Sequence, residues 1–157
     1  MFRSPSHLSP DARAKLAETL NARLVDGLDL HSQIKVAHWN VKGPNFAALH
    51  PLFETFAVGL ANFNDAIAER AVTLGALATG TARHVAKHSK LPDYPQETTR
   101  DLDHVRLLVE RFDRYLEGLR ESRGVGEKLA DVDTVDLLTG VISEFEKHSW
   151  FLRASLE

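Results

Sequence analysis

Apolar residues recur every three or four positions through four long segments of the chain, and this spacing is typical of amphipathic α-helices. The pattern predicts helices over residues 10–39, 45–77, 97–122 and 133–156, the second beginning at either 45 or 50. Their apolar stripes comprise Leu16, Leu20, Leu24, Leu28 and Ile34; Leu52, Phe56, Leu60, Phe63 and Ile67; Leu102, Val105, Val109, Phe112, Leu116 and Leu119; and Leu137, Val141, Phe145 and Leu152. No segment alternates apolar and polar residues as a half-buried β-strand does, so we expect an all-α protein.

Helix ends are marked by proline, glycine and a capping serine. The pair Ser9-Pro10 provides an N-cap and a first helical position, which leaves residues 1–9 as a short tail. The sequence Lys42-Gly43-Pro44 is expected to end the first helix. Gly124 and Gly126 are expected to break the third.

The second and third predicted helices are joined by residues 78–98, a long connection that is expected to contain one short helix at 82–89. The other two connections are short. This order of connections is that of a ferritin-like four-helix bundle, in which one long crossover carries the chain to the far end. We expect one such domain over residues 1–157, although the pattern also fits any other four-helix bundle.

Composition narrows the chemistry available to this bundle. The chain has no cysteine, which excludes disulfides and thiolate-bound metals, so any metal must have nitrogen and oxygen ligands. The formal net charge is −3, and Arg3, Arg13 and Lys15 are too few for a strong basic arm, which argues against binding nucleic acid through bulk charge. No apolar stretch reaches the ~18 residues of a membrane span, and the N-terminus has no apolar signal core. We therefore expect no contact with a membrane and a cytoplasmic location.

The second predicted helix carries a polar face opposite its apolar stripe. At about 100° per residue, His50, Glu54, Asp65 and Glu69 fall within one sector of about 100°. A water-exposed face is the simplest interpretation, but the same side carries small apolar residues where a solvated face usually has charged ones. We therefore expect a subunit interface there. The small residues are Ala57, Val58, Ala61, Ala68 and Val72.

Distance separates the polar residues into two groups. His50 and Asp65 lie 15 positions apart, about 22 Å along a helix, so one metal ion cannot bind both within a subunit. A two-fold axis with the two copies of this helix antiparallel brings His50 and Glu54 of one subunit to Asp65 and Glu69 of the other. Two identical sites then form, and His38 joins them because the turn after the first helix brings the chain back beside it. Imidazole and carboxylate ligands without thiolate suit iron, manganese or zinc.

An internal di-iron site of the ferritin type is the alternative to an interface site. Such a site uses paired Glu-x-x-His motifs, and the chain has none. Its nearest matches, Asp101 with His104 and Glu144 with His148, are expected at the surface. The interface site is therefore favoured.

Three further histidines are weaker candidates. His84 and His88 are four positions apart and could share a metal if helical, but exposed loop histidines usually bind nothing. His31 lies two helical turns before His38 and is expected to be a polar interface residue near the site.

The most distinctive segment is HWNVKGPNFAALH at 38–50. It is followed by Glu54, Asp65, Glu69, Arg70, Leu74 and Gly75. Further distinctive segments are LATGT at 77–81, PDYP at 92–95 and EKHSWFL at 146–152. Together these features resemble the Dps family, the "DNA-binding protein from starved cells" miniferritins, over almost the whole chain.

This resemblance implies a dodecameric shell of four-helix subunits, built from two-fold dimers, with a ferroxidase site at each two-fold interface. Such a site oxidises Fe(II), preferably with hydrogen peroxide, and ferric mineral is stored in the hollow centre, which protects DNA from oxidative damage. Carried over by position, His38, His50 and Glu54 of one subunit and Asp65 and Glu69 of its partner would bind iron, with zinc or manganese as substitutes.

The resemblance also implies roles for residues outside the ligand set. Trp39 would lie close to the site. The acidic cluster of Asp131, Asp133 and Asp136 resembles the family's pore at a three-fold axis, through which iron enters. Helix N-capping accounts for acids at this position equally well, so both interpretations stay open.

Three features depart from the family pattern. Members commonly have Asp where this chain has Glu54. Pro51 fits only a first helical turn, so the second helix either begins near His50 or is kinked there. The N-terminus lacks the lysine-rich tail linked with DNA binding in some members, so we expect weak DNA binding, and association with the nucleoid stays open. A non-enzymatic DNA-compacting oligomer and a helical oligomer holding a structural metal are the alternative functions.

Overall fold

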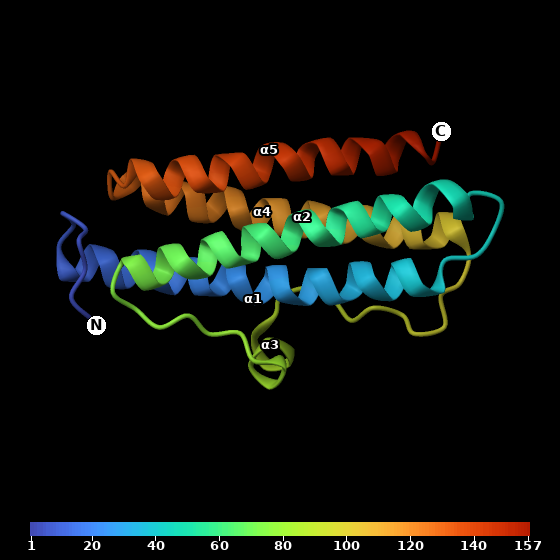
Figure 1. The fold of residues 1–157 in the computed structure, drawn as a ribbon. Helices are drawn as coiled ribbons and strands as arrows, with labels where there is room; N and C mark the ends of the chain where they lie inside the picture. The colour runs from blue at the N-terminus through green and yellow to red at the C-terminus, as the bar shows by residue number, and fades with distance from the viewer.

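The computed structural model describes all 157 residues and consists of five helices with no sheet. The long helices lie side by side, and the short helix lies outside the bundle (Figure 1). Their bounds are α1 Pro10–Asn40, α2 Phe46–Thr73, α3 Ala82–His88, α4 Asp101–Lys128 and α5 Val132–Ala154. The all-α class, the four-helix bundle and the long crossover with its short helix are confirmed. None of the helices combines the length and apolar character needed to cross a membrane.

The core lies where two helix pairs meet. α1 packs along α2 and α4 packs along α5, and α1–α4 and α2–α5 contacts join the pairs (Figure 1). Every residue of the four predicted apolar stripes belongs to the core or packs against it. Phe112 of α4 makes edge-on contacts with Phe56 of α2 and Phe145 of α5, at ring-centroid distances of 5.5 and 5.1 Å. Aromatic packing of this kind fixes the spacing of the helices that carry the polar face.

The turn between α1 and α2 is held by Asp101, the first residue of α4. Its carboxylate accepts hydrogen bonds from the backbone and side-chain amides of Asn45, both at 2.9 Å. Gly43 has φ +138°, and a Cβ there would lie 2.6 Å from the Asp101 carboxylate, so only glycine fits this turn. Asp101 is buried, and its predicted surface position is wrong because the turn covers it.

Three predicted helix boundaries are wrong: α4 begins at Asp101 and not at residue 97, α4 ends at Lys128 and not at residue 122, and α2 ends at Thr73 and not at residue 77. α4 continues through Gly124 and Gly126, because a glycine in a helix costs only about 1 kcal/mol and does not by itself end it. Gly126 faces Val135 where α4 meets α5, and a Cβ there would lie 3.1 Å from the valine side chain. α2 begins at Phe46, so Pro51 lies inside it, and the helix ends at Thr73 before the left-handed Gly75.

The surface positions predicted for His104 and His148 are also wrong, because both side chains are buried. His104 shares a 2.6 Å hydrogen bond with the hydroxyl of Tyr94, which ties the crossover to α4. His148 lies 4.4 Å from the Phe56 ring, measured between centroids, with one nitrogen 2.9 Å from Glu144. Burial lowers the pKa of both imidazoles, so both are neutral structural residues near pH 7.

Candidate metal site

The end of α1 and the start of α2 bring two imidazoles into contact. The rings of His38 and His50 stack with centroids 3.8 Å apart and an interplanar angle of 22°. Nδ1 of His38 lies 2.8 Å from the backbone oxygen of His50, and Nδ1 of His50 lies 2.9 Å from the backbone oxygen of His38. Both helix ends are therefore tied together by the two side chains.

These two hydrogen bonds fix the chemistry of the rings. A carbonyl oxygen only accepts, so Nδ1 is the donor in each imidazole. In the neutral form the lone pair then lies on Nε2, which is the atom left to bind a metal. Metal-binding histidines in proteins are commonly held by this kind of Nδ1–H contact. The hydrogen bonds to backbone oxygens thus fix the direction of the Nε2 atoms of His38 and His50.

Glu54 lies one helical turn after His50, and its carboxylate lies beside the His38 ring. Its carboxylate is 3.4 Å from Nε2 of His38 and pairs closely with the ammonium of Lys35. The hydrogen bond from Lys35 lowers the pKa of Glu54 and keeps it ionised. Lys35 was not anticipated from the sequence, although its position one turn before His38 on α1 places it on the same face.

Asp65 and Glu69 form the second group, further along α2. Both side chains are exposed, and neither has a hydrogen-bond or ion-pair partner within the chain. The separation from His50 is about 22 Å along the axis. No group of three or more histidine, aspartate and glutamate side chains comes together within one chain to hold a metal ion. Each group is therefore at most half of a site.

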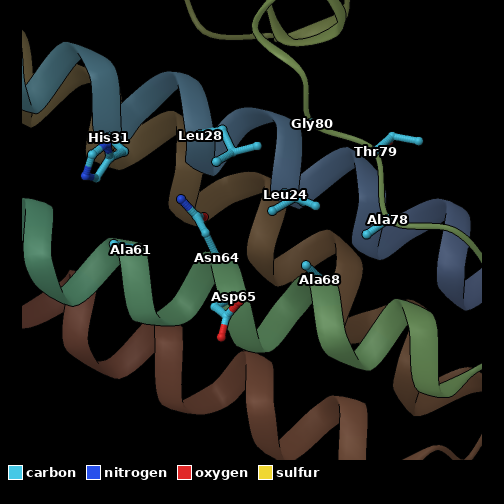
Figure 2. Close-up of a pocket in the computed structure, with 10 residues that line it drawn as sticks. All are labelled: Leu24, Leu28, His31, Ala61, Asn64, Asp65, Ala68, Ala78, Thr79 and Gly80. Atoms are coloured by element: carbon cyan, nitrogen blue, oxygen red, sulfur yellow. The ribbon is translucent and has the colours of Figure 1, made fainter.

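His31 lies between the two groups on α1. It is half-buried and lines the same groove as Asp65, shown in Figure 2. Burial is the main cause that lowers the pKa of His31, and the positive charge of Lys35 adds to it, while Glu54 opposes it. A neutral imidazole therefore faces the groove. His31 therefore shares a groove with Asp65, but within one chain it makes no hydrogen bond or ion pair with His38, His50, Glu54, Asp65 or Glu69.

The face that carries both groups is open in the single chain. Val58 and Val72 are 55% and 49% exposed, and Trp39 beside the His38 site is 67% exposed. Ala57 is an exception, because it is buried in the core and does not belong to this face as predicted. Exposed apolar side chains around unpaired carboxylates are typical of a surface that is covered on assembly.

The acidic cluster before α5 is divided by burial. Asp131 is 1% exposed, and both of its oxygens accept hydrogen bonds from Arg70 at 2.7 and 2.8 Å. It therefore joins α2 to α5 and does not face solvent as a pore residue would. Asp133 and Asp136 are exposed, and only these two stay candidates for a pore.

The α3 histidines are close together as well. The rings of His84 and His88 stack at 4.2 Å, and Nδ1 of His88 donates to the backbone oxygen of His84 at 2.9 Å. No carboxylate completes a metal site with them. The flanking Arg83 and Lys87 make their surroundings positive, which disfavours a cation.

Comparisons with known proteins agree with this architecture. The ferritin-like domain family matches residues 17–157. The DNA protection during starvation protein of Agrobacterium fabrum is 34% identical over 155 residues, covering 99% of this chain and 96% of that protein. The solved structure of Mycobacterium smegmatis Dps in a tetragonal form superposes with a TM-score of 0.94 at 33% identity, covering 99% and 94% of the two chains.

A third comparison concerns the metal chemistry. A Vibrio cholerae Dps structure, described as a member of a broad superfamily of ferritin-like diiron-carboxylate proteins, has a TM-score of 0.93 at 27% identity and covers 100% of this chain and 98% of that one. The fold thus defines a ferritin-like domain, and its second helix carries carboxylate and imidazole groups on one face. The chain belongs to the Dps family of miniferritins, which assemble as homo-oligomers, handle iron and protect DNA.

Proposed function

We propose that this protein oxidises Fe(II), preferably with hydrogen peroxide, at sites completed between two subunits. Two Fe(II) ions lose one electron each, and one peroxide accepts both electrons with two protons to give two molecules of water. Because both electrons reach the same peroxide, no hydroxyl radical is released. Iron is the substrate here, and the ferric product is stored in a hollow oligomer.

The observation that carries this proposal is the register of the two half-sites on α2. His50 and Glu54 are separated by one helical turn, and so are Asp65 and Glu69. In an antiparallel two-fold pair of α2 helices, the contact that brings His50 opposite Glu69 also brings Glu54 opposite Asp65. One symmetry operation therefore completes two identical sites, which neither chain forms alone.

The roles of the residues follow from their chemistry. Glu54, Asp65 and Glu69 supply hard oxygen ligands, and His38 and His50 supply Nε2 atoms whose direction is fixed by the Nδ1 hydrogen bonds. Zinc or manganese would fit the same donor set, and zinc would do so without the two-electron reaction because it is redox-inert. Trp39 and His31 lie at the margins of the site.

The assembly and its surroundings belong to the same proposal. Twelve subunits forming a shell, and a cytoplasmic location, are proposed from the family resemblance. Asp133 and Asp136 are proposed to line a pore through which iron enters, because they are exposed and lack the buried pairing of Asp131.

DNA binding is the second candidate function, and α3 favours it. The chain has no aspartate or glutamate between Arg70 and Pro92, and within this stretch Arg83, Lys87 and Lys90 make no ion pair. Unpaired cations on an exposed helix suit a phosphate backbone. Three such residues support weak, salt-sensitive association of the intact oligomer.

The test is anaerobic Fe(II) loading of the intact oligomer followed by a peroxide pulse, with ferric absorbance as the signal. The wild type should consume about two Fe(II) per peroxide, and Asp65→Ala/Glu69→Ala should slow oxidation by about tenfold or more, as expected when metal-site support is lost. The matched control is Glu117→Ala/Glu121→Ala, which removes an exposed pair of the same charge and spacing from α4. Equal rates in the three proteins would refute the interface ferroxidase, and tight metal binding without oxidation would favour a structural metal.

A further inference from the structure

A groove of about 400 Å³ lies between α1 and α2 beside Asp65. Figure 2 shows its position, with the segment before α3 along one edge. Half of its ten lining residues are apolar, namely Leu24, Leu28, Ala61, Ala68 and Ala78, and the others include His31, Asn64 and Asp65. An apolar groove next to a metal ligand excludes large polar molecules but admits a small one that finds a hydrogen-bonding partner inside.

Asn64 supplies such a partner. Its side chain lines the groove and reaches from α2 toward α1 (Figure 2), yet the residue is only 4% exposed. Neither its amide nitrogen nor its amide oxygen has a hydrogen-bond partner in the chain. A buried amide without partners costs about 1–3 kcal/mol, so a molecule that hydrogen-bonds to it is held there. The helix itself does not require an asparagine at position 64, because asparagine has a lower helix propensity than leucine or alanine.

Gly27 and Tyr115 make room for this amide. A Cβ on Gly27 would collide with the oxygen of Asn64 and would lie 3.0 Å from the Tyr115 hydroxyl, so glycine keeps the space open. The Tyr115 hydroxyl is itself buried and has no partner. The unpartnered polar groups of Asn64 on α2 and Tyr115 on α4 thus both lie beside Gly27 of α1, and the Asn64 amide offers a donor and an acceptor to a molecule that can both accept and donate hydrogen bonds.

We propose that this groove is the peroxide-binding subsite of the interface ferroxidase, with Asn64 as its positioning residue. Hydrogen peroxide has the required size, two O–H donors and lone pairs on both oxygens, and Asp65 at the groove edge places it next to the iron. Asn64 gives no electron and forms no covalent bond; it holds peroxide while two Fe(II) ions reduce it to two waters. This inference rests on the proposed function.

The first test separates peroxide binding from the chemical step. Asn64→Leu keeps the four branched heavy atoms of the side chain but removes the amide, and Gln96→Leu is the control because it removes an exposed amide from the crossover. In Asn64→Leu the KM for peroxide should rise about fivefold, as expected for one lost hydrogen bond. The kcat and the anaerobic binding of Fe(II) should stay at wild-type values. A KM within twofold of the wild type, with ferroxidase activity intact, would overturn the subsite and leave the proposed function standing.

The second test does not depend on ferroxidase activity. Crystals of the iron-free oligomer are soaked in hydrogen peroxide and compared with unsoaked crystals. Density for a two-oxygen molecule within hydrogen-bond distance of the Asn64 amide is the expected result, and it should be absent in Asn64→Leu. Density for a single water oxygen both before and after soaking would show a structural water only and would overturn the proposal. This outcome can be read whether or not the protein oxidises iron.

Discussion

Arg70 and Asp131 join the end of α2 to the start of α5, and replacement of Arg70 tests how much this buried pair stabilises the fold. The guanidinium of Arg70 bonds both oxygens of Asp131, and its Nε donates to the Thr134 hydroxyl at 3.0 Å. The Arg70 side chain is 16% exposed and the Asp131 side chain 1%. Burial tends to raise the pKa of Asp131, but hydrogen bonds from Thr134 and Arg70 outweigh it and hold that pKa below its usual value.

Arg70→Met leaves the Asp131 carboxylate buried without its charged partner. Loss of one partner of a buried pair costs about 3–5 kcal/mol, and the partial exposure of Arg70 places the expected loss near the lower end. For a domain of this size, about 3 kcal/mol corresponds to a fall of about 6–12 °C in the thermal midpoint. The double variant Arg70→Met/Asp131→Asn should recover part of the loss, because the buried charge is then removed as well.

Thermal unfolding should be followed at one protein concentration, because the midpoint of an oligomer depends on it. Asp133→Asn is the control, since its side chain is 71% exposed and its 3.8 Å contact with Arg70 is solvated; it should change the midpoint very little. The wild-type advantage over Arg70→Met should shrink as the pH falls below about 4, where the carboxyl of the unfolded chain begins to protonate. A loss under about 1 kcal/mol in Arg70→Met, or one equal to that of Asp133→Asn, would refute the assigned buried pair.

Three further predictions concern single positions. Gly43→Ala should lower the thermal midpoint by several degrees, because its positive φ and the nearby Asp101 leave no room for a Cβ; an unchanged midpoint would contradict this. Burial lowers the pKa of His148 in the folded protein below that of an ordinary histidine. As the pH falls through the ordinary histidine pKa, the unfolded chain therefore binds a proton at this residue more readily than the folded protein does, and the free energy of unfolding should decrease from pH 7.5 to 5.5. His148→Leu should show a smaller decrease when stability is measured by urea titration at the two pH values. A decrease identical to that of the wild type would show that another group causes it. Lys35→Met should tighten Co(II) binding, measured by absorbance, because Glu54 no longer has to leave an ammonium partner; weaker binding would show that Lys35 supports the ligand.

The sequence predicted those features of the fold that depend on local spacing. The four apolar stripes face the core because a helix repeats every 3.6 residues whatever surrounds it. The N-cap is local as well, and the hydroxyl of Ser9 accepts from the amide of Ala12 at 3.3 Å. The distance of about 22 Å between His50 and Asp65 along α2 follows from the rise of a helix alone.

Features that depend on packing between distant segments could not be predicted in this way. Asp101, His104 and His148 were expected at the surface because they are polar, yet the turn after α1, Tyr94 and an aromatic cluster cover them. Asp131 could have been identified as buried only by knowing that Arg70, far away in the sequence, reaches it. In each case the decisive partner lies in another element.

The same distinction applies to the site. The spacing of His50, Glu54, Asp65 and Glu69 identifies one face of a helix, but it does not show which atoms are ready to bind a metal. That comes from contacts between α1 and α2, where the backbone oxygens of His38 and His50 each hold the Nδ1 atom of the opposite ring and so fix the direction of both Nε2 atoms. One half-site is therefore ordered before assembly, whereas the carboxylates of the other half have no partner. In the proposed interface site a metal would need both halves, so it should stabilise the dimer in proportion to its affinity, and assembly and iron oxidation should be lost together.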